Sequence, residues 1–215
     1  FETIREYGLE RLAASSEEAA TRRRHAEWSL ALGQRAEAEM LGADQRTWAE
    51  RLEWDHPNLR AALRWLAVNG PIDDALRLAN HLLVFWFIQG HLVEGRRWYQ
   101  ELLTLAEGSG AAFRARANYG AALLAWAHGD PDASERFGRA ALAISTASGL
   151  VFEEAMSLFV LHIVTSTHGR HEEALDLGLQ GQVGGEGERL HRGISGAAGT
   201  GGGRRRPVRR ASARR

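Results

Sequence analysis

The chain has 215 residues and balances 27 basic against 27 acidic side chains, and all of those basic residues are arginine. The absence of lysine excludes a Walker-A phosphate loop and lysine Schiff-base chemistry. The absence of cysteine excludes disulfides, thiolate catalysis and cysteine metal clusters. No run of about 18 apolar residues is present, so we expect no membrane span. The lack of cysteine fits a cytoplasmic protein.

Apolar residues recur with a helical period from residue 1 to about residue 179, and no segment alternates as a strand does. The sequence therefore predicts an all-α chain. Glycine and proline breaks divide it into ten expected helices. They cover residues 2–14, 16–41, 44–54, 56–69, 72–89, 91–107, 111–128, 131–148, 150–168 and 171–180. Because the chain begins inside an amphipathic pattern, we expect it to be a fragment of a longer protein, and no signal peptide is visible.

Asp55 stands just before the helix expected over 56–69, and His56 and Pro57 are its first residues. Aspartate is a common N-cap and proline is tolerated in a first turn, so we interpret the three residues as a helix start. The alternative is an acid–histidine pair for proton transfer. That chemistry needs a third group or a pocket, and the neighbouring sequence supplies neither.

Three later segments share one pattern, in which a turn glycine is followed by a small residue. The small residues are Gly95, Ala133 and Ala174, spaced by 38 and then 41 positions. An aromatic follows four positions later in the first two copies, as Tyr99 and Phe137. A small residue lets two helices approach, and the aromatic fills the space toward the next pair. The pattern is similar to a tetratricopeptide repeat of more than standard length, and it predicts a right-handed superhelix of antiparallel helix pairs.

Three separated stretches extend this resemblance in the same order. They are FETIREYGLERLAAS at 1–15, RLEWDHPNLRAALRWL at 51–66 and QGHLVEGRRWYQELL at 89–103. They resemble stretches of the large bacterial signal-transduction ATPases of the LuxR, maltose-regulator and antibiotic-regulator type. Those proteins carry an NB-ARC-like ATPase, a helical connector and a tetratricopeptide sensor array. His56 stands where the family usually has asparagine, and Gly8 stands where it has a helical alanine.

The resemblance implies a division of the chain. Residues 1–54 would be the connector after a missing winged-helix and ATPase part, and residues 55–180 would be the sensor repeats. The implied function is to bind a protein, a peptide or a small-molecule inducer and to modulate the absent ATPase. Binding rather than catalysis is expected, with no cofactor and no metal. The alternative function is that of a structural scaffold that self-associates. An enzymatic function is the least favoured.

Residues 181–215 depart from the helical pattern and hold 10 of the 24 glycines and 9 of the 27 arginines, against two acids. A segment of this composition is expected to be disordered because it cannot bury enough apolar surface. Three interpretations stay open. The favoured one is a frameshift product, and the others are an ordinary linker and a basic tail that binds nucleic acid weakly through its phosphates.

Four residues are the candidate partner-binding positions on the concave face of the expected superhelix: Arg77, Asn80, Asn118 and Trp126. Asn80 and Asn118 lie 38 residues apart, at equivalent positions of two first helices. Arginine and asparagine there can hold the backbone or carboxylate of an extended peptide. The alternative is that these are ordinary solvated polar positions. The histidines at 162, 168 and 171 lack the spacing of a zinc motif.

Overall fold

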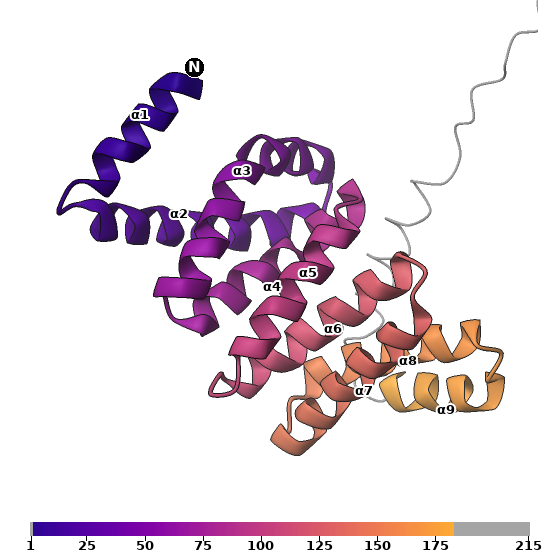
Figure 1. Ribbon diagram of the computed structural model, residues 1–215. Coiled ribbons are helices and arrows are strands. Elements are labelled where there is room, and N and C mark those ends of the chain that lie inside the picture. The colour runs from indigo at the N-terminus through magenta and orange to yellow at the C-terminus, as the bar shows by residue number, and fades with distance from the viewer. Residues whose placement is uncertain (1, 183–215) are drawn as a thin grey trace, which may run out of the picture.

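A computed structural model describes residues 2–182, and this part of the chain folds into α-helices joined by short turns, without a strand (Figure 1). The prediction of an all-α chain is confirmed. The expected tail lies outside the described residues from position 183 onward. The helices are α1 (Glu2–Ala13), α2 (Glu18–Met40), α3 (Gln45–Asn69), α4 (Ile72–Gln89), α5 (Leu92–Leu105), α6 (Ala111–Ala127), α7 (Pro131–Ser148), α8 (Val151–Thr167) and α9 (His171–Gln182).

The predicted helix start at Asp55 is wrong, because α3 passes through this position without interruption. Pro57 lies inside the helix, where its ring nitrogen cannot donate to the carbonyl of Glu53. Leu52 and Leu59 on either side of the proline are both fully buried. Burial of this apolar face stabilises the helix on both sides of the proline and outweighs the lost hydrogen bond. Local capping preferences alone do not reveal such a tertiary contribution.

The helices form two layers of alternating members. The even-numbered helices α2, α4, α6 and α8 each pack against the next even-numbered helix, and each helix from α2 onward also packs against its successor. Figure 1 shows these pairs following one another from α2 to α9. The odd-numbered helices are linked by ion pairs across a gap of 34 residues: Arg60–Glu94, Arg96–Asp130 and Arg139–Glu173.

A glycine in the left-handed region ends three of the even-numbered helices. Gly90, Gly129 and Gly169 have φ of 79°, 83° and 74°, and they lie 39 and 40 residues apart. A residue with a Cβ is strained at such φ values, so glycine is required to reverse the chain there. The breaks that the sequence predicts at these three positions are all present.

Close packing between helix pairs depends on a small residue and an aromatic. A Cβ on Gly95 of α5 would lie 2.7 Å from the ring of Trp86 on α4 and 2.5 Å from a methyl of Leu124 on α6. One turn later, Tyr99 is fully buried, and its hydroxyl donates to the carbonyl of Ala79 at 3.1 Å. The small residue thus admits the neighbouring helices, and the aromatic joins them.

The main core extends from α2 to α8, and a smaller one joins α8 to α9 through Leu158, Leu161, Val164 and Leu177. The tryptophans divide between core and surface: Trp86 and Trp98 are buried, whereas Trp54 is 87% exposed. Among residues 2–182, no helix combines the length and the apolar character needed to cross a membrane.

Candidate functional site

Three ionisable side chains from three successive even-numbered helices meet in one network. Glu37 on α2 contacts His81 on α4, and Nδ1 of the histidine is 2.6 Å from Oε2 of the glutamate. The other oxygen of Glu37 pairs with the guanidinium of Arg116 on α6. The three side chains are only partly accessible, with exposed fractions of 12% for His81, 20% for Glu37 and 35% for Arg116. The network therefore ties three helix pairs together at a half-buried place.

The charge state of the network follows from burial. Burial lowers the pKa of His81 to about 4, and the positive charge of Arg77 acts in the same direction. The imidazole is therefore neutral near pH 7 and its Nδ1 donates a hydrogen bond, since a carboxylate oxygen only accepts. Burial also lowers the pKa of Arg116, while the negative charge of Glu153 on α8 opposes that change. The interaction between Glu153 and Arg116 thus extends this row of charged side chains, which begins with Glu37 and His81, to a fourth even-numbered helix.

Two of the predicted binding residues, Arg77 and Asn80, lie on α4 beside the first turn of α6. The guanidinium carbon of Arg77 is 5.8 Å from the centroid of the Phe113 ring, and Arg77 pairs with Asp74 at 3.5 Å. Asn80 is buried, and its Nδ2 donates to the carbonyl of Phe113 at 3.3 Å. Arg77 is therefore on the surface as expected of a binding residue, whereas Asn80 joins α4 to α6.

The other two predicted residues lie on α6. Asn118 is buried, and its Nδ2 donates to the carbonyl of Arg114 at 2.9 Å. Trp126 is partly buried and packs against the main core. The expectation that Asn80 and Asn118 lie open on a groove is corrected by their burial. Both amide nitrogens are already bonded within the chain. A partner role for the four positions stays a prediction, with Arg77 the most accessible of them.

Sequence reasoning missed Glu37, His81 and Arg116. One local signal was present: His81 follows Asn80 as the second polar residue in the otherwise apolar stretch LANHLLVFWFI. Its partner lies 44 positions away, and Arg116 lies 79 positions from Glu37. Pairings over such distances leave no periodicity in a single sequence.

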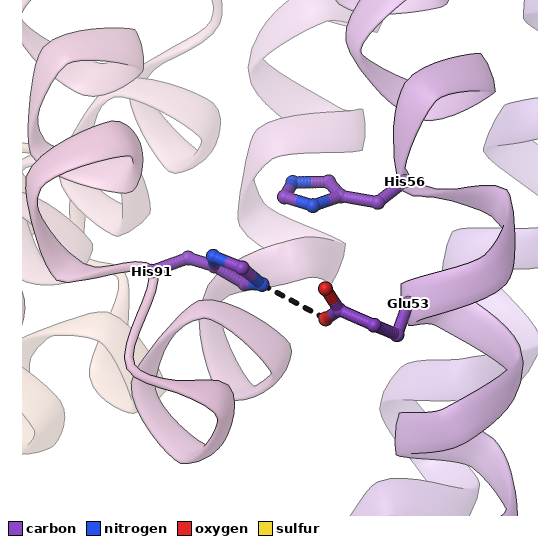
Figure 2. A group of neighbouring side chains, drawn as sticks. All are labelled: Glu53, His56 and His91. Carbon is purple, nitrogen blue, oxygen red and sulfur yellow. Dashed lines mark hydrogen bonds and ion pairs between the residues drawn. The ribbon is translucent and has the colours of Figure 1, made fainter.

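A second polar cluster lies between α3 and the turn that joins α4 to α5. Figure 2 shows Glu53 and His56 projecting from α3 toward His91 in that turn. Oε2 of Glu53 is 2.8 Å from Nε2 of His91, and the two imidazole rings have centroids 4.4 Å apart. A cleft of about 500 Å³ opens beside the cluster, and Arg60 and Glu94 also line it. The sequence interpretation had favoured a helix start for His56 over an acid–histidine pair for proton transfer.

The histidine group considered in the sequence is not brought together as ligands. Nδ1 of His162 is 2.7 Å from the carbonyl oxygen of Ala174, and His168 lies beside the carboxylates of Asp132 and Glu135. Within residues 2–182, the set that could converge on one ion is Glu53, His56 and His91.

Known proteins match only part of the chain. A segment of 102 residues is 40% identical to the protein named "Putative HTH-type transcriptional regulator Rv0890c" from Mycobacterium tuberculosis. The same identity over 102 residues is found with "Putative HTH-type transcriptional regulator Mb0914c" from Mycobacterium bovis. This segment is 47% of the present chain and 11% of each relative. No family model matches the chain, and no solved structure matches it. The chain is thus similar to a small part of proteins that are named as putative transcriptional regulators.

Proposed function

We propose that this chain is a helical-repeat binding module of a transcriptional regulator and that it has no catalytic activity of its own. Residues 55–180 form a tetratricopeptide-like right-handed superhelix, and residues 1–54 connect it to an ATPase part of a longer cytoplasmic protein. The alternating layers of helices and the recurrent turn glycines support the repeat assignment. The similarity to the mycobacterial proteins supports the regulatory role.

The pairing of Glu37 with both His81 and Arg116 carries this proposal. The carboxylate of Glu37 on α2 holds both α4 and α6 through these two side chains. A partner that offers its own carboxylate competes with Glu37 for Arg116, and binding of that partner alters how successive helix pairs are held. Differential contacts of this kind are what couple an occupied site to a distant part of a protein.

The chemical class of the partner follows from the exposed charged group nearest to this network, which is Arg77. Arg77 presents a guanidinium over an aromatic ring, and such a group binds carboxylates through directed hydrogen bonds. We propose an acidic peptide or protein segment as the partner, with an acidic small-molecule inducer as the other ligand of the same chemistry. The ATPase part receives the signal. We propose no membrane partner, and nucleic acid takes part only indirectly or through the Arg-rich tail.

The experiment is selection of peptides from a random display library on the full chain, followed by affinity measurement of the enriched peptides. Arg77→Ala is the test variant, and Arg139→Ala on α7 is the matched control. The two arginines have side-chain exposures of 48% and 50%, and each pairs with an acid one turn away. Arg139 also pairs with Glu173 on α9, so the circular-dichroism spectrum of both variants is recorded to show that they fold. We expect acidic peptides that bind at least tenfold more weakly to Arg77→Ala and with unchanged affinity to Arg139→Ala. Equal loss in both variants, or enrichment without acidic residues, contradicts the proposal.

Self-association is the second candidate function. Leu175 and Leu179 lie one turn apart on α9 and are 61% and 54% exposed. An exposed apolar pair on one face of a helix, here the last helix of the described residues, can pair with a second copy. Sedimentation of the full chain over a range of concentrations distinguishes the two functions. A dimer that Leu175→Glu dissociates supports the scaffold, whereas a monomer at all concentrations excludes it.

A further inference from the structure

We propose that Glu53, His56 and His91 form a binding site for a divalent transition-metal ion of the zinc class. Each residue offers one ligand atom, and these atoms all lie within 4.8 Å of one another. Two imidazoles and one carboxylate are a ligand set that Zn²⁺ takes, with a water molecule completing the tetrahedron. This inference rests on the α3–α5 region and is independent of the partner surface proposed above.

The three ligand atoms can surround such an ion after small movements of their side chains. Bonds of about 2.1 Å in a tetrahedron place ligand atoms roughly 3.4 Å apart. The Glu53–His91 pair is already at 2.8 Å, and both side chains retain freedom to adjust, with exposed fractions of 49% and 25%. No two of these ligand atoms are more than 4.8 Å apart, so reaching a spacing of about 3.4 Å requires at most about 1.4 Å of relative movement between any pair.

His56 provides the independent observation that points to a ligand. The residue is 4% exposed, and its Nε2 is buried without a hydrogen-bond partner. This nitrogen lies 3.2 Å from Oε1 of Glu94, but not in hydrogen-bonding geometry. A buried polar group without a partner has lost its hydration and gained no hydrogen bond in exchange, which is unfavourable. An ion bound to the other ring nitrogen, Nδ1, would fix the ring with Nε2 facing Glu94, so that the Nε2–H can donate a hydrogen bond to this carboxylate.

Glu94 is held in place to orient that ring. Nε of Arg60 donates to Oε1 of Glu94 at 2.7 Å, and the guanidinium also pairs with Oε2. Nε1 of Trp98 also donates a hydrogen bond to Oε1, at 3.4 Å. A carboxylate that contacts the free nitrogen of a ligating histidine is the usual outer support of a zinc site. Glu94 is thus a positioning residue, and Arg60 and Trp98 fix it.

The protonation state suits metal binding. The imidazole of His56 is 4% exposed, and burial disfavours the charged form, which leaves the neutral ring with the lone pair that an ion needs. The cleft beside the cluster gives the fourth coordination position access to water. A bound ion would link α3 to the turn between α4 and α5 and stabilise the fold by mass action.

The test is titration of the full chain with ZnCl₂ by isothermal calorimetry, with thermal unfolding measured in parallel. His91→Gln and Glu53→Gln remove ligands that are not deeply buried, so both variants are expected to fold. The matched control is His168→Gln, since His168 has an exposed fraction of 26% against 25% for His91 and lies beside carboxylates, as His91 lies beside Glu53. We expect one Zn²⁺ per wild-type chain and a raised midpoint of unfolding.

The expected loss of affinity is at least 100-fold in His91→Gln and at least tenfold in Glu53→Gln, with no change in His168→Gln. Co²⁺ provides a second readout, because a tetrahedral site gives intense visible absorption that His91→Gln should abolish. Absence of saturable binding overturns the proposal. So does binding that His168→Gln weakens as much as His91→Gln does.

Discussion

The phenol of Tyr99 on α5 lies directly against Gly120 on α6, so closely that a Cβ on the glycine would be 2.5 Å from the tyrosine oxygen. The same oxygen donates a hydrogen bond to Ala79 on α4. Tyr99 therefore connects three helices, and the absence of a side chain at position 120 is what allows it to do so.

Gly120→Ala is expected to lower the free energy of unfolding by about 1–3 kcal/mol, the usual cost of forcing extra volume into a packed core. The tyrosine ring is fully buried and cannot move aside without displacing α4 or α6. Urea unfolding measures the change. Gly8→Ala is the control, because nothing lies within 4 Å of a Cβ there. The better helix propensity of alanine should leave stability equal or raise it by up to about 1 kcal/mol. Equal effects of the two substitutions would refute the packing argument.

Gly129→Ala is expected to destabilise the chain by about 1–2 kcal/mol, because φ at this turn is 83° and alanine adopts that region with strain. Gly108→Ala in the turn before α6 is the comparison, since it has open space and no left-handed φ. The midpoint of thermal unfolding should fall only in the first variant. A midpoint that is unchanged in Gly129→Ala would show that this turn relaxes freely.

Sequence periodicity was sufficient to predict the helical class and most turns, because glycine conformation and apolar spacing are local properties. Position 90 shows this, as the glycine that interrupts the apolar pattern is the residue that reverses the chain. The error at Asp55 had the opposite origin. Its N-cap preference and the proline at position 57 are local signals, whereas the burial of Leu52 and Leu59 that keeps α3 continuous is tertiary.

The site was harder to predict for the same reason. Asn80 was correctly placed on α4, but the sequence could not show that its amide already bonds to Phe113, 33 positions away. His56 and His91 were 35 positions apart, with no motif between them. Only the packing of α3 against the α4–α5 turn places the two rings at 4.4 Å.

Stability should fall with acidification because of His81. Its pKa is about 4 in the folded chain and near 6.5 when unfolded, so the unfolded state takes up the proton first as pH decreases. The free energy of unfolding should therefore decrease between pH 6.5 and pH 4, by at most about 3 kcal/mol from this group. Urea unfolding at several pH values, compared with His81→Gln, isolates the contribution. Parallel pH profiles for the two proteins would exclude it.

Arg116→Met should raise the pKa of His81. In the native chain the charge of Glu37 is shared with Arg116, and the buried imidazole stays neutral. Methionine conserves most of the side-chain volume but removes the cation, so the carboxylate 2.6 Å from Nδ1 then favours the imidazolium. Titration of the His81 ring protons by NMR measures the change. Arg46→Met is the control, because Arg46 is 92% exposed on α3. A His81 pKa that stays near 4 in Arg116→Met would mean that desolvation alone sets it and that the three residues do not act as one network.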